Sequence, residues 1–142
     1  MIITLDPDSS TPFYEQLRNQ IVLGIATGQL EPGEKLPTVR QLAEELSMNP
    51  MTVNKAYALM KQEGFIAIDR RHGAKVKPQL KASQERKELP PRLEQELQLL
   101  IAEASIHGMD REGFQEACGR IFARMAGGID QDTDSTEHQT DG

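Results

Sequence analysis

Aromatic residues and cysteine are both scarce in this chain of 142 residues. Trp is absent and aromatic side chains make up only 4% of the sequence, so we expect a modest core of aliphatic side chains. Cys118 is the only cysteine, so no disulfide can form within the chain, which is typical of a reducing compartment. No apolar run approaches the ~18 residues of a membrane span, and the first residues lack the pattern of a signal peptide. We therefore expect a soluble, cytoplasmic protein that does not associate with a membrane.

The chain also lacks the residue groupings that carry catalysis or hold a metal. Its three histidines, His72, His107 and His138, are far apart, and none has a second metal ligand at a short spacing. Cys118 has no neighbouring His or Lys that would activate it, so we interpret it as a packed helix residue. We find no phosphate-binding loop, no dinucleotide-binding glycine pattern and no catalytic constellation. The sequence therefore predicts no catalytic residue, no metal site and no cofactor.

The net charge of −6 is unevenly distributed along the chain. Residues 1–78 contain nine Lys/Arg and nine Asp/Glu, whereas residues 79–142 contain seven and thirteen. All of the excess acid therefore lies in the second part of the chain. The run from Arg70 to Lys77 has four positive charges and no acid, and such a local cluster decides where phosphates can dock.

Two short amphipathic helices are predicted between Thr38 and Gly64. Apolar residues recur at i, i+3, i+4 and i+7 in each of them: Val39, Leu42, Ala43 and Leu46 in the first, and Val53, Ala56, Tyr57 and Met60 in the second. The corner between them contains Asn49, a good N-cap, and Pro50, which suits the first helical position. Two helices across such a corner form a helix-turn-helix, whose second helix can enter the major groove of DNA.

The segments before this pair predict one more helix. Apolar residues recur every fourth position from Thr11–Pro12 to Thr27, which indicates a helix that packs one face inward. Thr38 and Gln41 have the spacing of a capping box, which marks the start of the first helix of the pair. A brief β-like run is expected at Ile2–Leu5.

A β-hairpin is predicted directly after the third helix. Phe65–Asp69 and Ala74–Lys77 have the character of two strands, with Arg70–Gly73 as the turn between them. A hairpin that follows a helix-turn-helix is a wing. The predicted fold class is therefore α+β, with a winged helix-turn-helix domain over residues 1–78.

Two more helices are predicted in the second part of the chain. One follows Pro90–Pro91 and ends at Gly108, and Asp110 can cap another from Arg111 to about Met125. Two helices cannot enclose a core by themselves, so their apolar stripe either packs back on the first domain or meets a second chain; we favour homodimerisation. The residues expected at that contact are Leu93, Leu97, Leu100, Ile101, Ala104, Phe114, Ile121 and Phe122.

The predicted domain organisation follows from these elements. Residues 79–126 form a two-helix dimerisation segment, which begins with a polar connection that runs as far as Lys87. Residues 127–142 are rich in acid and poor in apolar side chains, so we expect them to be disordered. A dimer would place two recognition helices in successive major grooves, about 34 Å apart, on an inverted-repeat operator.

Six short motifs occur in a fixed order over roughly residues 10–77. They are Pro12-Phe13-Tyr14-x-Gln16-Leu17, Gly28-x-Leu30-x-Pro32-Gly33, Leu36-Pro37-Thr38-x-Arg40-x-Leu42-Ala43, Thr52-Val53-x-x-Ala56-Tyr57, Gly64-Phe65-Ile66 and the wing turn Arg70-x-x-Gly73. Together they resemble the N-terminal domain of GntR-type bacterial transcription regulators. The corner motif and the short C-terminal part are similar to the YtrA branch of that family, which implies regulation of nearby transporter operons.

The resemblance implies DNA contacts in three places. Arg40 would contact the phosphate backbone or the bases, the start of the recognition helix would read the major groove, and the wing tip would enter the minor groove. The matching positions are Asn49, Pro50, Met51, Thr52, Asn54 and Lys55 on the helix, and Arg71, His72 and Gly73 at the wing, beside the charged Arg70. Asn can pair with adenine, and Lys can reach guanine or a phosphate, so these residue types suit double-stranded DNA.

Other classes of function predict different features. A winged helix used only for protein–protein interaction has no need of a basic wing. An aminotransferase-like domain, which some GntR-type chains carry, needs far more residues than follow the wing here. The C-terminal part is also too short for the effector-binding domains of other branches, so a small-molecule effector, if there is one, would bind between the C-terminal helices and the DNA-binding domain or at the dimer interface. We therefore predict a sequence-specific DNA-binding regulator, most simply a dimeric repressor.

Overall fold

The computed structural model describes residues 2–78 and 88–127. They belong to two compact units, divided between residues 83 and 84. The connection expected up to Lys87 and the acidic tail expected from residue 127 fall almost wholly outside the described residues. No helix in the two described ranges is long and apolar enough to cross a membrane.

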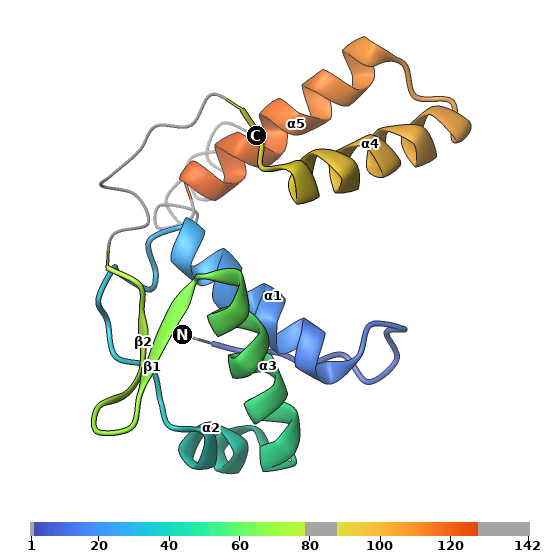
Figure 1. Cartoon of the computed structure of the whole chain (residues 1–142). Coiled ribbons are helices and arrows are strands. Elements are labelled where there is room, and N and C mark those ends of the chain that lie inside the picture. The colour runs from blue at the N-terminus through green and yellow to red at the C-terminus, as the bar shows by residue number, and fades with distance from the viewer. Residues whose placement is uncertain (1, 79–87, 128–142) are drawn as a thin grey trace, which may run out of the picture. The chain divides into compact units, whose positions relative to one another are not determined.

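The first unit contains three helices followed by a two-stranded antiparallel sheet (Figure 1). The elements in chain order are α1 (Phe13–Ala26), α2 (Val39–Leu46), α3 (Pro50–Glu63), β1 (Ile66–Asp69) and β2 (Gly73–Val76). The predicted order of three helices and a hairpin is confirmed. The strands differ slightly from the prediction, because Gly73 pairs with Asp69 and so belongs to β2 rather than to the turn.

Local capping chemistry sets the helix boundaries in the middle of this unit. The Thr38 hydroxyl accepts a hydrogen bond from the Gln41 amide, and the Gln41 side chain accepts one from the Thr38 amide, which completes the predicted capping box. Asn49 caps α3 by accepting from the Met51 amide. Gly64 ends α3 with a φ of 88°, a left-handed conformation that glycine adopts without strain.

The core of the first unit is built from the predicted apolar stripes. Its fully buried side chains include Leu17, Ile21, Leu42, Val53, Tyr57, Met60, Ile66 and Val76. Tyr57 is only 2% exposed, as expected for a core residue. Phe13, the first residue of α1 and the first member of its apolar stripe, stays 40% exposed.

The β-like run expected at Ile2–Leu5 is not a strand in the structure. Its backbone bonds to glutamine side chains of α1 instead of to a neighbouring strand. The Gln20 side chain accepts from the Thr4 amide and donates to the Thr4 carbonyl, and Gln16 does the same for Asp6. Two glutamines one turn apart therefore hold an extended segment along the helix without a sheet.

The loop between α1 and α2 also pairs with the wing, which the sequence did not predict. The Leu36 amide donates to the Ala74 carbonyl, and the Val76 amide donates to the Glu34 carbonyl, both at 2.8 Å. Lys35 and Lys75 form an isolated antiparallel bridge between these bonds. The base of the wing is therefore fixed to the segment that leads into α2.

The described part of the second unit is a helical hairpin of α4 (Pro91–Ile106) and α5 (Arg111–Ala126). Asp110 caps α5 as predicted by accepting from the Gly113 amide. Neither helix contains a buried residue. Leu97, Ala104 and Phe114 are half-buried within the hairpin, whereas many of its large apolar side chains are exposed.

Candidate nucleic-acid interface

The N-terminal half of α3 presents polar side chains and one apolar side chain to solvent. Val53 and Ala56 point into the core, which leaves Asn54 and Lys55 exposed and Thr52 half-buried. Met51 is 78% exposed, so its side chain is accessible to a partner at the start of α3. Its methyl and thioether groups match the apolar C5-methyl of thymine in the major groove.

Asn49 has a structural role as well as its predicted one. Its side-chain oxygen accepts from the Met51 amide and so is occupied by the cap. The side-chain NH₂ group of Asn49 is then the part that can donate to a base or a phosphate. Pro50 is exposed beside it at the first helical position, as predicted.

Arg40 lies in the first turn of α2 and is exposed. Its side chain forms no hydrogen bond or ion pair with any residue that the structure describes. A cation at a helix N-terminus gains nothing from the helix dipole, whose partial charge there is also positive. The exposed guanidinium of Arg40 is therefore accessible to an anion from outside the protein.

The wing tip is organised by Asp69. Its carboxylate accepts a hydrogen bond from the Arg71 amide, and its second oxygen lies 2.8 Å from Nδ1 of His72. The hydrogen bond with His72, and next the one with Arg71, hold the pKa of the Asp69 carboxyl below its ordinary value. Gly73, the first residue of β2, follows the turn with a φ of 74°. This local network directs the backbone of the tip and leaves the side chains of Arg70 and Arg71 exposed.

The three groups of predicted residues lie toward one end of the first unit. In Figure 1 the hairpin tip, α2 and the start of α3 all lie toward the lower end of this unit. Arg70 and Arg71 form no ion pair with any described residue, so the positive charge of this end is open to solvent. An exposed helix start and exposed arginines at the same end of the unit suit a phosphate-lined duplex.

A row of polar contacts joins α1 to α3 beside this surface. The Arg18 guanidinium binds the Glu63 carboxylate through two bonds of 2.8 and 2.9 Å, and it lies 5.6 Å from the centre of the Phe65 ring. Nearer the start of α3, the Lys55 ammonium lies 4.1 Å from the centre of the Tyr14 ring. Sequence reasoning did not identify Tyr14 or Arg18 as partners of the recognition helix, because no local pattern connects α1 to α3.

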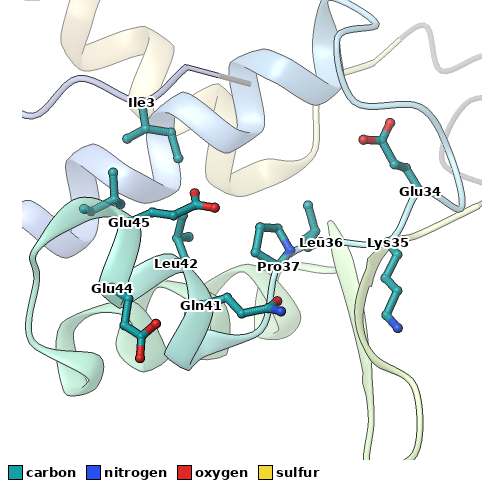
Figure 2. Close-up of a pocket in the computed structure, with 10 residues that line it drawn as sticks. Ile3, Glu34, Lys35, Leu36, Pro37, Gln41, Leu42, Glu44 and Glu45 are labelled. Carbon is teal, nitrogen blue, oxygen red and sulfur yellow. The ribbon is translucent and has the colours of Figure 1, made fainter.

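A surface hollow of about 790 Å³ on another side of α2 has the opposite charge (Figure 2). Glu44 and Glu45 from α2, with Glu34 from the preceding loop, line it around an apolar floor that includes Leu42; Lys35 is its only basic lining residue. Three carboxylates repel phosphate, so the charge of this hollow does not favour contact with DNA.

A residue that lines this hollow, Pro37, also contacts Tyr57, whose pKa is shifted. The Tyr57 hydroxyl donates to the carbonyl of Pro37, which lines the hollow, at 2.7 Å. Burial, with a smaller contribution from the charge of Glu45, raises the pKa of Tyr57 to about 12. The hydroxyl therefore stays protonated and acts as a structural donor.

Three helices, a wing and an exposed second helix of a helix-turn-helix together define a winged-helix DNA-binding protein. Residues 13–76 match the model of the bacterial regulatory proteins of the gntR family. The chain is also 35% identical over 131 residues to the HTH-type transcriptional repressor YtrA of Bacillus subtilis, an alignment that spans 92% of this chain and all of that protein. The chain therefore belongs to the GntR family.

Solved structures agree with this assignment. The chain is 38% identical to the GntR-family transcription factor YtrA from Sulfolobus acidocaldarius, with a TM-score of 0.59, over 75% of this chain and 99% of that one. A GntR family transcriptional regulator from Listeria monocytogenes is 29% identical with a TM-score of 0.58, over 80% and 97% of the two chains. The protein is thus a DNA-binding transcription regulator and not an enzyme, as the sequence predicted.

Proposed function

We propose that this protein is a dimeric repressor that binds an inverted-repeat operator. The observation that carries the proposal is the exposed start of α3 beside the exposed arginines of α2 and the wing. The name of the Bacillus relative, a transcriptional repressor, supports repression rather than activation. A winged domain that occupies a promoter excludes polymerase without any further chemistry.

Each predicted contact has a distinct role in this proposal. Met51, Thr52 and Asn54 read base edges in the major groove, with the Asn49 amide beside them, while Pro50 sets the start of the helix. Arg40 binds a backbone phosphate and fixes the register of α3 on the duplex. The wing tip, Arg70, Arg71, His72 and Gly73, enters the neighbouring minor groove, whose narrow stretches attract arginine.

The second unit supports dimerisation by what it leaves exposed. Its large apolar side chains that remain exposed are Leu89, Leu93, Leu99, Leu100, Ile101, Ile106, Met109, Ile121 and Phe122. A soluble two-helix hairpin that leaves this many apolar side chains in water needs a partner surface. Two such hairpins can form a four-helix bundle with an apolar interior. We therefore place the dimer contact on α4 and α5, over the predicted segment 79–126.

The resemblance to the YtrA branch also suggests which genes this protein regulates. The YtrA branch implies a transporter operon near the regulator's own gene, so the upstream region of that gene is the first operator to test. An inverted repeat there, with half-sites one helical turn apart, is the expected target.

Fluorescence anisotropy with this upstream DNA tests the DNA contacts. The wild type should prefer it over scrambled DNA of the same length, and affinity should fall steeply with salt. Arg40→Ala should weaken binding roughly tenfold. Arg120→Ala is the matched control, because it removes the same charge from α5, where Arg120 faces Glu116. Equal binding of both DNAs by the wild type would contradict the proposal.

Sedimentation analysis tests the dimer. The wild type should sediment as a dimer, and Leu100→Glu with Phe122→Glu should give a monomer, because both substitutions place charge in the proposed apolar contact. Leu23→Glu makes the same kind of change at an exposed leucine of α1 and should leave the dimer intact. A monomeric wild type at the concentrations used for DNA binding would refute dimerisation.

A further inference from the structure

The contact between Lys55 and Tyr14 distinguishes Lys55 from the other exposed residues of the recognition helix. The Lys55 ammonium lies 4.1 Å from the centre of the Tyr14 ring, within the range of a cation–π interaction. Lys55 is exposed, whereas Tyr14 is half-buried against the core. The flexible lysine stem is therefore directed toward α1 before any DNA binds.

The ring is itself held in a fixed place relative to α3. Tyr14 and Arg18 are one turn apart on α1, and Lys55 and Glu63 are two turns apart on α3, so the two pairs form one row between the helices. The two-bond contact of Arg18 with Glu63 anchors the far end of this row. This contact helps to fix α1, and with it Tyr14, relative to α3.

The direction of Lys55 bears on which part of DNA it can reach. A side chain that reads a base edge must extend from the helix toward the floor of the groove. Lys55 instead leans sideways toward α1, where the wall of the groove, lined with phosphates, would pass the recognition helix. An ammonium is a compact point charge that suits a phosphate and carries little base preference.

We propose that Tyr14 is a positioning residue that holds the Lys55 ammonium for a backbone phosphate of DNA, so that Lys55 anchors the duplex and does not read its sequence. This inference rests on the proposed DNA-binding function. The ring lies on one side of the ammonium, and because Lys55 is otherwise exposed, the ammonium remains accessible to the phosphate. Because the stem is ordered before binding, less conformational entropy is lost when the complex forms.

The first test concerns the role of Lys55, by anisotropy with upstream and scrambled DNA at several salt concentrations. Lys55→Met should weaken binding to both DNAs by the same factor and reduce the slope of log K against log salt by about 1. The preference for the upstream DNA should not change. A loss confined to the upstream DNA would show that Lys55 reads a base and would overturn the inference.

The second test concerns the ring of Tyr14. Tyr14→Leu should weaken binding to both DNAs roughly three- to tenfold with an unchanged salt slope, because the charge of Lys55 remains but its position is lost. Tyr14→Phe keeps the ring and should bind like the wild type. If Tyr14→Phe binds as weakly as Tyr14→Leu, the hydroxyl and not the ring is responsible, and the inference is wrong.

The double variant separates positioning from a merely structural role. In the Lys55→Met background, Tyr14→Leu should cause no further loss of affinity, since there is no ammonium left to position. A further loss would mean that Tyr14 acts through the stability of the fold, which thermal unfolding of each variant measures independently. A wild type that prefers the upstream DNA, with a Lys55→Met variant that binds equally well, would overturn this inference while leaving the proposed function intact.

Discussion

The hydroxyl of Tyr57 donates a hydrogen bond of 2.7 Å to the carbonyl of Pro37. Tyr57 is on the recognition helix, and Pro37 immediately precedes the capping residue Thr38 of α2. One part-buried bond therefore joins the recognition helix to the residue before the cap of α2, three positions ahead of Arg40. The relative placement of Arg40 and the start of α3 depends on this contact.

Removing the hydroxyl should destabilise the first unit. Tyr57→Phe keeps the ring in the core but leaves the Pro37 carbonyl without its donor, which should lower the free energy of unfolding by about 1–2 kcal/mol. Urea denaturation followed by circular dichroism measures this change. An unchanged midpoint would mean that water replaces the hydroxyl as the donor.

Alkaline pH should destabilise the wild type through the same residue. The pKa of Tyr57 is raised to about 12 in the folded protein, whereas the unfolded tyrosine titrates near 10, so the folded state binds more protons between these values. The stabilising contribution of Tyr57 is complete below pH 10 and is lost as pH rises toward 12, a difference of about 2–3 kcal/mol in the free energy of unfolding. The wild type should show this loss relative to Tyr57→Phe in denaturation series at each pH.

Breaking the Arg18–Glu63 pair should loosen α1 from α3. The two side chains are largely buried and share two charged hydrogen bonds. Arg18→Met keeps the apolar stem but leaves the Glu63 carboxylate without this partner, so we expect a loss of about 1–3 kcal/mol. Arg92→Met is a control in the second unit, because Arg92 also faces a glutamate, Glu96, but on the surface of one helix, where such pairs contribute little. Equal losses in the two variants would contradict the assigned role of the Arg18 pair.

The stabilising effect of Thr38 on α2 should come from its hydroxyl group and not from its methyl group. Thr38→Ala removes the acceptor of the Gln41 amide and should cost about 1 kcal/mol of stability, and it should weaken DNA binding because Arg40 lies in the same turn. Thr38→Ser keeps the acceptor and should behave like the wild type in both measurements. A serine variant as unstable as the alanine variant would show that the threonine methyl group, and not the cap, matters.

Sequence reasoning predicted best those parts of the fold that are determined locally. Thr38, Asn49, Pro50 and Gly64 each act on backbone groups a few residues away, and the structure places the helix boundaries at these residues. The apolar periodicity then assigned the buried faces, because a helix of period 3.6 has one face toward the core. The winged fold followed from the order of these local signals, whereas the family followed from the resemblance of the six motifs to GntR-type regulators.

Contacts between distant segments could not be predicted in this way. Arg18 and Glu63 are 45 residues apart, and the local sequence around either residue does not predict that the two are in contact. The same holds for Tyr14 with Lys55 and for the two glutamines that hold the N-terminal segment. Such pairs depend on how α1 lies across α3, which is decided by the packing of the whole core and not by any short motif.

Gly119 should be a site where stability can be gained. It lies within α5, and a Cβ added there would meet no described atom within 4 Å, so alanine fits without strain. Gly119→Ala should raise the free energy of unfolding by about 0.5–1 kcal/mol per chain, because alanine loses less backbone entropy than glycine in a helix. Gly113→Ala is the matched control on the same helix: its Cβ would lie 3.2 Å from the Asp110 carboxylate that caps α5, so the gain should be smaller or absent. Thermal unfolding measures both variants, and sedimentation shows whether the dimer is retained.

A Gly119→Ala variant that dissociates the dimer would contradict this prediction. It would instead place a partner helix against this glycine, where only a hydrogen atom fits.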